Sequence, residues 1–218
     1  MPIPLVNSVV SWFLKKRIHQ IEFFSKYPNE VQHELLFNLL QSAKNTALGK
    51  KYDFATIKTY EAFIARVPVI SYEDMEPLIE QSRKGEQELF WDSQIKWFAK
   101  SSGTTNAKSK FIPVSQESLD DCHYKGSKDL LCLYLNNNEN SKLFRGKGLR
   151  LGGSKELYQE NGTVFGDLSA ILIDNMPFWA EYSSTPSSKI SLMDNWETKL
   201  QEIVDETIKE NVTSLAGV

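Results

Sequence analysis

The spacing of the apolar residues changes near residue 90, and this change constrains the fold more than any other feature of the sequence. Before it, apolar side chains recur at intervals of three and four residues, which is the period of one helix face. After it, Ile95, Trp97 and Ala99 alternate with Lys96 and Phe98, which is typical of a strand with one face more buried than the other. The sequence therefore predicts an α/β fold in which N-terminal helices are followed by a mixed sheet with flanking helices.

Two helices are predicted before residue 70. The apolar residues of segment 31–43 fall on one helix face, and Gly49 stands where a C-terminal cap is expected. A shorter helix is predicted over 58–66, and Thr59 is its expected N-terminal cap. Together with a third helix that starts at about residue 71, these two helices predict that segment 1–90 is mainly helical.

A capping pair marks the start of the third helix. Ser71 is followed three residues later by Asp74, a spacing at which the two side chains and the backbone at a helix start can exchange hydrogen bonds. This helix is predicted to run to about residue 83 and to end at Gly85. The buried faces of the second and third helices are expected to consist of Tyr60, Phe63, Met75, Leu78 and Ile79.

Strands and helices are both predicted over segment 91–218. Ser115 is expected to cap a long helix that continues to about Asn136, and Asp194 to open the last helix. Pro113 favours an edge position for its strand, because proline has no backbone N–H to donate to a neighbour. The further strands are expected over residues 111–114, 148–151, 170–173 and 211–218.

Charge and cysteine content exclude several classes of protein. The chain has 25 basic and 28 acidic side chains, a net charge of −3 and a pI near 5.7, so it lacks the basic footprint of a nucleic-acid-binding protein. Cys122 and Cys132 do not form a disulfide framework or a zinc motif, and the three histidines are scattered. The basic cluster Lys15-Lys16-Arg17 follows the apolar start of the chain, whereas a secretory signal carries its charge first.

These features predict a cytoplasmic protein with no membrane or nucleic-acid partner. No window supplies the roughly 18 unbroken apolar residues that a membrane span needs. One alternative stays open for residues 3–24, which can also be interpreted as an amphipathic helix lying on a surface.

Residues 101–110 are the segment in which the residue types point to chemistry. They read Ser-Ser-Gly-Thr-Thr-Asn-Ala-Lys-Ser-Lys and lie between two predicted strands. Small and hydroxylated residues let the backbone approach a ligand and present N–H and O–H groups to an anion, while Lys108 and Lys110 supply positive charge for a polyphosphate. The segment is not a Walker loop, because it lacks Gly-Lys-Ser/Thr and a helix directly after it. A plain solvated turn is the alternative.

The run Ser101-Ser102-Gly103-Thr104-Thr105, followed by Lys110 and Pro113, resembles the phosphate-binding motif of the adenylate-forming enzymes. It is most similar to the branch formed by the Gretchen Hagen family of acyl acid amido synthetases. The resemblance extends over essentially the whole chain. Further pieces that are similar to this branch are Val67-Pro68-Val69, Tyr72-Glu73-Asp74, Pro77-Leu78-Ile79, Gly85, Gly152-Gly153-Ser154 and the final residues 213–218.

The resemblance implies a ligase that uses ATP and Mg²⁺. Such enzymes join a small carboxylic acid to AMP, release pyrophosphate, and then transfer the acyl group to the amine of an amino acid. The catalytic role falls to Lys110, which would neutralise charge on the departing pyrophosphate. The residues expected to hold the β- and γ-phosphates are Ser101, Ser102, Gly103, Thr104 and Thr105, with Lys108 as a substitute cation; no protein metal ligand is expected.

The sequence departs from the family pattern in two ways. Asn106-Ala107 stands where a glycine is usual, although asparagine tolerates the left-handed conformation. Family members are more than twice as long, so residues 1–218 are expected to be the N-terminal portion of one adenylate-forming domain, with the rest of that domain and the C-terminal domain absent. The apolar end of the chain favours the same interpretation; the alternative is a terminal strand that completes a sheet. The isolated chain is therefore expected to be inactive.

Two other functions stay open at this point. An acyl-CoA ligase differs only in its second nucleophile, a thiol in place of an amine. A non-catalytic interaction module would use the same fold and leave the Ser/Thr loop as a turn. The identity of the acid and the amine and the oligomeric state are not indicated by the sequence.

Overall fold

A computed structural model describes residues 4–101, 109–152, 158–160 and 162–217 of the chain. The N-terminal helices are α1 (Pro4–Lys15), α2 (Ile18–Lys26), α3 (Pro28–Ala43), α4 (Ala47–Lys51), the 3-10 turn η1 (Phe54–Thr56), α5 (Tyr60–Arg66) and α6 (Tyr72–Arg83). The later helices are the π-helix η2 (Ser118–Tyr124), α7 (Lys125–Asn137), the 3-10 turn η3 (Leu143–Arg145), α8 (Leu168–Asp174), α9 (Phe178–Tyr182), α10 (Ser188–Ser191) and α11 (Trp196–Thr207). The strands are β1 (Trp97–Lys100), β2 (Phe111–Val114), β3 (Lys147–Leu151), β4 (Tyr158–Glu160), β5 (Thr163–Gly166), β6 (Ser184–Thr185) and β7 (Val212–Gly217).

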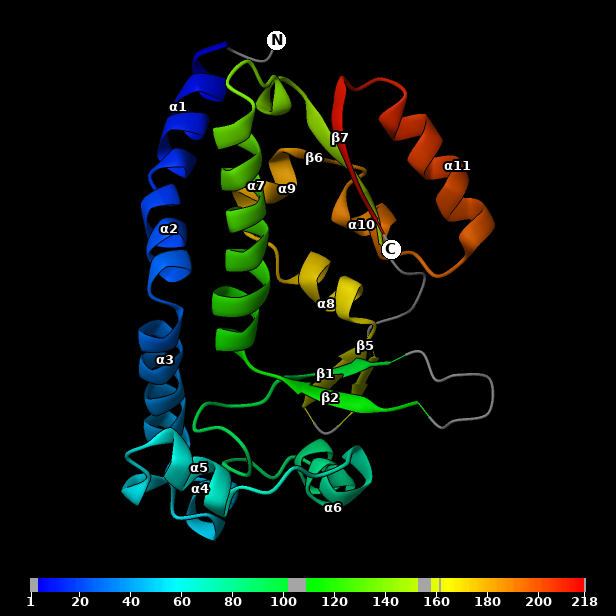
Figure 1. Cartoon of the computed structure of the whole chain (residues 1–218). Helices are drawn as coiled ribbons and strands as arrows, with labels where there is room; N and C mark the ends of the chain where they lie inside the picture. The colour runs from blue at the N-terminus through cyan, green and yellow to red at the C-terminus, as the bar shows by residue number, and fades with distance from the viewer. Residues whose placement is uncertain (1–3, 102–108, 153–157, 161, 218) are drawn as a thin grey trace.

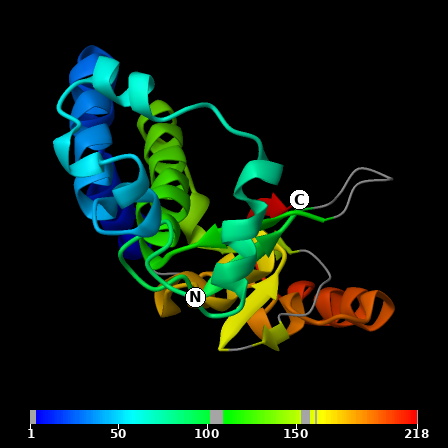
Figure 2. The ribbon, with the colours of Figure 1, turned by 90° about the horizontal axis from the view of Figure 1, so that it is seen from below.

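The elements separate into a helical column and two sheets (Figure 1). Helices α1, α2 and α3 follow one another along one side of the molecule, and α7 lies beside α1 and α2. Seen from below, this column stands apart from the strands (Figure 2). The predicted combination of N-terminal helices and a mixed sheet with flanking helices is confirmed.

The first sheet is mixed and has the strand order β2-β1-β5-β4. Strand β1 is antiparallel to β2 and parallel to β5, and β4 is antiparallel to β5. Strand β2 lies at an edge, which confirms the position predicted from Pro113. Two strands of this sheet, β4 and β5, were not predicted from the sequence.

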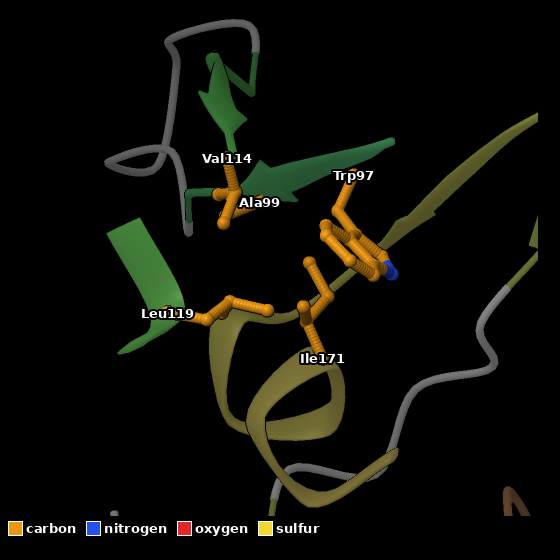
Figure 3. Packing of buried hydrophobic residues seen from close by; sticks show 5 residues of the cluster. All are labelled: Trp97, Ala99, Val114, Leu119 and Ile171. Atoms are coloured by element: carbon orange, nitrogen blue, oxygen red, sulfur yellow. The ribbon is translucent and has the colours of Figure 1, made fainter. Parts of the chain in front are cut away.

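Strand β1 is buried on both faces, so the expectation of one better-buried face is wrong. On one face, Trp97 and Ala99 pack with residues of β2, η2 and α8 (Figure 3). On the other face, Phe98 is fully buried against Ile79 of α6 and Phe165 of β5. The alternation in the sequence missed this because a central strand covered by helices on both sides has no solvent face.

The second sheet contains β6, β3 and β7 in that order, and all its strands are parallel. The strand predicted over 148–151 is confirmed as β3. The strand predicted at the end of the chain is confirmed as β7, which pairs with β3 along its length.

The strand predicted over 170–173 is wrong, because this segment lies within α8. Its side chains Ala170, Ile171 and Ile173 are buried. A short apolar run fits a buried strand and a buried helix equally well, so periodicity alone cannot separate them. Strand β5 precedes this segment, and α8 packs on the sheet face that carries Trp97 and Ala99.

Gly49 does not cap the first predicted helix. Helix α3 is confirmed but ends at Ala43, and Gly49 lies buried inside the short helix α4, which Thr46 caps. A Cβ atom at Gly49 would lie 2.0 Å from the carbonyl oxygen of Ala43. Glycine is therefore required here for a close approach between backbones and not for a left-handed cap.

The other helix starts follow the predicted capping signals closely. Thr59 caps α5, and Ser71 and Asp74 form a complete capping box at the start of α6. Gly85 ends α6 with a φ of 101°. The last helix is confirmed, but its cap is Asn195 and not Asp194.

Burial follows the predictions less well. Ile79 is buried as expected and Phe63, Met75 and Leu78 are partly buried, but Tyr60 is exposed. The long helix after Ser115 is confirmed and reaches Asn137, with its first turns in π form.

Candidate functional site

The two ends of the loop between β1 and β2 are held together by one backbone hydrogen bond and one bond to a side chain. The N–H of Ser101 donates to the carbonyl oxygen of Lys110 at 2.9 Å, and the N–H of Lys110 donates to Oγ of Ser101 at 3.2 Å. These bonds extend the β1–β2 ladder by one residue pair beyond Lys100 and Phe111. The structure thus places Ser101 and Lys110 side by side at the root of the loop.

The remaining predicted phosphate-binding residues lie outside the described residues. They are Ser102, Gly103, Thr104, Thr105 and Lys108. Gly153 and Ser154, which also resemble family pieces, lie outside them too.

Helix α6 positions the side chain of Lys110. Its Nζ lies 3.0 Å from Oε1 of Glu73 and 4.8 Å from the ring centroid of Tyr72. The hydroxyl of Tyr72 accepts the N–H of Phe111 at 2.9 Å, which ties the first turn of α6 to the start of β2. Because Tyr72 and Phe111 are 39 residues apart in the chain, no spacing rule predicts this contact.

The ion pair between Lys110 and Glu73 is exposed to solvent. The Lys110 side chain is 42% exposed and that of Glu73 is 66% exposed. The pKa of Glu73 is lowered, first by a hydrogen bond from a backbone N–H at the helix start and then by the bond and charge of Lys110. Exposed pairs contribute little to folding, so Glu73 can release Lys110 to a more highly charged anion at small cost.

A shallow hollow of about 460 Å³ adjoins the root of the loop. Arg83 stacks its guanidinium on the ring of Phe111, 3.8 Å from the ring centroid, and pairs with Glu80. The residues around the hollow are Tyr72, Glu76, Glu80, Arg83, Lys100, Ser109 and Phe111. The surface next to Lys110 therefore carries charges of both signs.

Tyr124 and Gly152 have structural roles. The hydroxyl of Tyr124 donates to the carbonyl oxygen of Leu172 at 2.9 Å, and burial raises the pKa of Tyr124 to about 12. At Gly152 an added Cβ would lie 2.5 Å from Cδ1 of Ile173, and the Gly152 carbonyl oxygen accepts a hydrogen bond from buried Lys199 at 3.3 Å. Tyr124 therefore links η2 to α8, and the Gly152 carbonyl links the end of β3 to α11.

In the part of the chain that the structure describes, no group of three or more His, Cys, Asp or Glu side chains gathers to form a metal site. The same residues include no helix long and apolar enough to cross a membrane.

Residues 17–216 match the family described as GH3 family N-terminal domain. Among curated relatives, the chain is 32% identical over 117 residues to the indole-3-acetic acid-amido synthetase GH3.2 of Arabidopsis thaliana, covering 53% of this chain and 21% of that protein. It is 24% identical over 165 residues to the jasmonoyl--L-amino acid synthetase JAR4 of Nicotiana attenuata, covering 74% of this chain and 28% of the relative.

The fold is similar to that of a solved structure, the GH3.15 acyl acid amido synthetase. The TM-score is 0.72 at 20% sequence identity, and the match covers 85% of this chain and 32% of the other. The chain thus spans about a fifth to a third of the length of the proteins it matches.

Proposed function

The chain belongs to the GH3 family, and we propose from this membership that it forms the triphosphate-binding part of an enzyme that adenylates a carboxylic acid and transfers the acyl group to an amino acid. The observation that carries the proposal is the root of the β1–β2 loop, where Ser101 and Lys110 are fixed to each other at the end of a sheet buried on both faces. Anchored in this way, Ser101 and Lys110 can both face an anion bound at the end of the sheet.

We assign each proposed role to particular residues of segment 101–110. The hydroxyls and N–H groups of segment 101–105 hold the β- and γ-phosphates of ATP, and Lys110 neutralises the departing pyrophosphate, with Lys108 as a substitute. The Ser101 N–H already donates to Lys110. Its hydroxyl oxygen accepts a hydrogen bond but keeps its own proton, so the hydroxyl is the group of Ser101 that can donate to a phosphate.

In the proposed first step, the carboxylate of the acid attacks the α-phosphate of ATP, an acyl-adenylate forms, and pyrophosphate leaves. Both reactants are anions, so positive charge must offset their repulsion. Mg²⁺, when bound with the nucleotide, adds such charge and takes its ligands mainly from phosphate and water oxygens. In the second step an amine displaces AMP and an amide forms.

The acid and the amine are proposed only as classes. The relatives named above act on indole-3-acetic acid and on jasmonoyl and amino acid groups, according to their names. For this chain we propose a small carboxylic acid and an amino acid. We also propose a cytoplasmic location, because Cys122 and Cys132 are free thiols, as is usual in a reducing compartment.

We propose that residues 1–218 are the N-terminal portion of one adenylate-forming domain and do not complete the reaction alone. ATP–pyrophosphate exchange well above background by this chain would contradict that expectation. With the longer protein, a thioester product without amide would favour the acyl-CoA ligase alternative.

The decisive test is nucleotide binding by matched lysine variants. We expect ATP with Mg²⁺ to raise the melting temperature of the wild-type chain, because a ligand that binds only the folded state stabilises it. Lys110→Ala is expected to lose most of that shift. Lys125→Ala is the control, because Lys125 also pairs with an acidic side chain and is 45% exposed, close to the 42% of Lys110. Equal shifts in all three proteins, or none in the wild type, would favour an interaction module.

A further inference from the structure

Helix α1 turns an apolar face to solvent. The outer face of α1 includes Val9, Trp12 and Phe13, and the spacing places Lys16, just after the helix, on the same side. Val9 is 55% exposed, Trp12 is 62% exposed and Phe13 is 58% exposed. Single exposed apolar residues are ordinary, but three on one helix face, two of them large aromatics, form a patch.

The opposite side of α1 is held to the protein largely by polar groups. Asn7 donates to the carbonyl oxygen of Ser141 at 3.2 Å and accepts the N–H of Phe144 at 3.1 Å. Just after the helix, Arg17 forms two bonds to the carboxylate of Asp129, at 2.7 and 3.1 Å. Among the α1 side chains whose burial the structure describes, Leu14 alone is buried. Asn7 and Leu14 therefore hold the inner side of α1, while its aromatic side faces out.

Lysine side chains accompany the exposed aromatic rings. Lys16 Nζ lies 3.6 Å from the ring centroid of Trp12, and Lys128 of α7 lies 5.2 Å from that of Phe13. Long lysine side chains can place their charge beyond an apolar surface that they partly cover. An aromatic surface with lysines at its margin suits the boundary between lipid headgroups and acyl chains.

The local charge also differs from that of the rest of the chain. Residues 1–27 contain four basic side chains and one acidic side chain, a net charge of +3. The other residues contain 21 basic and 27 acidic side chains, a net charge of −6. Arg17 pairs with Asp129, so the basic side chains of this segment without that pairing are Lys15, Lys16 and Lys26, while the remainder of the chain is acidic.

Helix α9 provides an internal comparison. It exposes Phe178 at 84% and Trp179 at 72%, so it matches α1 in aromatic exposure. It contains Glu181 and no lysine or arginine. The exposed aromatics of α1 thus lie near lysines, whereas those of α9 lie near Glu181, whose carboxylate pairs with Arg150.

We propose that the outer face of α1 docks on the surface of an anionic lipid bilayer. Trp12, Phe13 and Val9 enter the headgroup boundary, and Lys16, with the neighbouring Lys15 and Lys128, lies against lipid phosphates. The cytoplasmic leaflet carries such anionic lipids. Residues 4–16 precede the segment that matches the family, so the face is not part of the matched segment. The proposal does not depend on the adenylation function.

The test is co-sedimentation of the 218-residue chain with vesicles. We expect binding to vesicles of 30% phosphatidylserine in phosphatidylcholine, weaker binding as salt rises, and little binding to phosphatidylcholine alone. Trp12→Ser with Phe13→Ser is expected to weaken binding about tenfold or more, since it removes the groups that enter the boundary. The control, Phe178→Ser with Trp179→Ser, removes the same two residue types from α9 and is expected to bind as the wild type does.

A second variant keeps the proposal testable if the aromatic variant fails to fold. Lys15→Gln with Lys16→Gln is expected to weaken binding to the anionic vesicles by about fivefold for each lysine, because one kcal/mol per charge is typical near such a surface. Equal binding to both vesicle types, equal losses in the α1 and α9 variants, or no vesicle binding by the wild type would overturn the proposal. So would a dimer that dissociates in the α1 variant without any vesicle binding, because that result assigns the face to a second copy of the chain.

Discussion

The two sheets of this protein are stabilised in different ways. The four-stranded sheet β2-β1-β5-β4 is packed on both faces by apolar side chains, with Phe98 and Phe165 fully buried. The three-stranded sheet β6-β3-β7 carries charged contacts, among them the ion pairs of Lys147 with Glu210 and of Arg150 with Glu181. No described residue of β3 is fully buried.

Because of this difference, we expect the stability of the two sheets to depend differently on pH. The candidate phosphate loop leaves the sheet whose stability comes from apolar burial, which depends little on pH. Next to the second sheet, the pKa of Glu181 lies below its ordinary value, so this carboxylate stabilises the fold when ionised, and acid is expected to weaken its contacts first. Four experiments test this contrast.

The largest expected effect is a loss of stability on substitution in the four-stranded sheet. Phe165→Ala removes a fully buried ring that lies 5.4 Å from the ring of Phe98 and 5.1 Å from that of Tyr158, measured between centroids. We expect the free energy of unfolding to fall by about 3 to 5 kcal/mol, measured by urea denaturation. Leu149→Ala in half-buried β3 is the control, and we expect it to lower the free energy of unfolding by clearly less. Equal decreases in the free energy of unfolding in both variants would contradict the idea that apolar burial stabilises mainly the four-stranded sheet.

The second effect concerns charge in the other sheet. Glu181 accepts hydrogen bonds from Ser188 and Arg150, and the bond to Arg150 is 2.9 Å long. We expect Glu181→Gln to lower the free energy of unfolding by about 1.5 to 3 kcal/mol at pH 7, because bonds to an ionised group are lost.

The pH dependence of this effect has a definite sign. Burial acts to raise the pKa of Glu181, but the hydrogen bonds from Ser188 and Arg150 outweigh it and leave the pKa below its ordinary value of 4.5. The contribution of Glu181 is therefore present above pH 4.5 and is lost as the pH falls through the lower folded pKa. Denaturation curves of Glu181→Gln and the wild type should approach each other in acid. Curves that stay parallel as the pH falls well below 4.5 would contradict this role.

The third effect is the loss of a helix cap beside the loop root. Ser71→Ala removes the capping box of α6 and is expected to lower the free energy of unfolding by about 1 kcal/mol. Thr59→Ala at α5 is the matched cap and is expected to cost a similar amount. Only Ser71→Ala should accelerate amide hydrogen exchange at Phe111, because Tyr72 at the start of α6 accepts that N–H. Equal acceleration in both variants would show that the contact does not transmit the change.

The smallest expected effect comes from removing the hydroxyl of Tyr124, which lies in η2 next to the four-stranded sheet. Tyr124→Phe removes a bond of 2.9 Å to Leu172 and is expected to cost about 1 kcal/mol. Burial raises the pKa of Tyr124 to about 12 from 10. The neutral form is therefore favoured by folding, and its contribution is complete below pH 10 and lost as the pH rises through about 12. As the pH rises from 10 towards 12, the wild type should lose stability relative to Tyr124→Phe; a wild-type advantage that stays constant or increases over this range would contradict the assignment.

Local signals were predicted well because their causes lie within a few residues. The capping box of Ser71 and Asp74 and the edge strand at Pro113 depend on the hydrogen bonds of one turn or one proline, and the structure confirms both. The segment 170–173 was predicted wrongly because its burial fits either a helix or a strand.

The candidate site was predictable only in part. The hydroxylated run and Lys110 are visible in the sequence, and the contact of Ser101 with Lys110 follows from a hairpin between adjacent strands. The contacts of Tyr72 and Glu73 with β2 were not predictable, because they join α6 to a distant strand.

By itself, the sequence determined the change from helices to strands, the helix starts and the chemical character of the segment 101–110, since these depend on neighbours along the chain. Only the tertiary structure decided which carboxylate pairs with Lys110, that β1 has no solvent face, and that the aromatic side of α1 points outward. The physical reason is that burial and ion pairing depend on surfaces brought together from remote parts of the chain, and a periodic pattern shows that a face exists without showing what covers it.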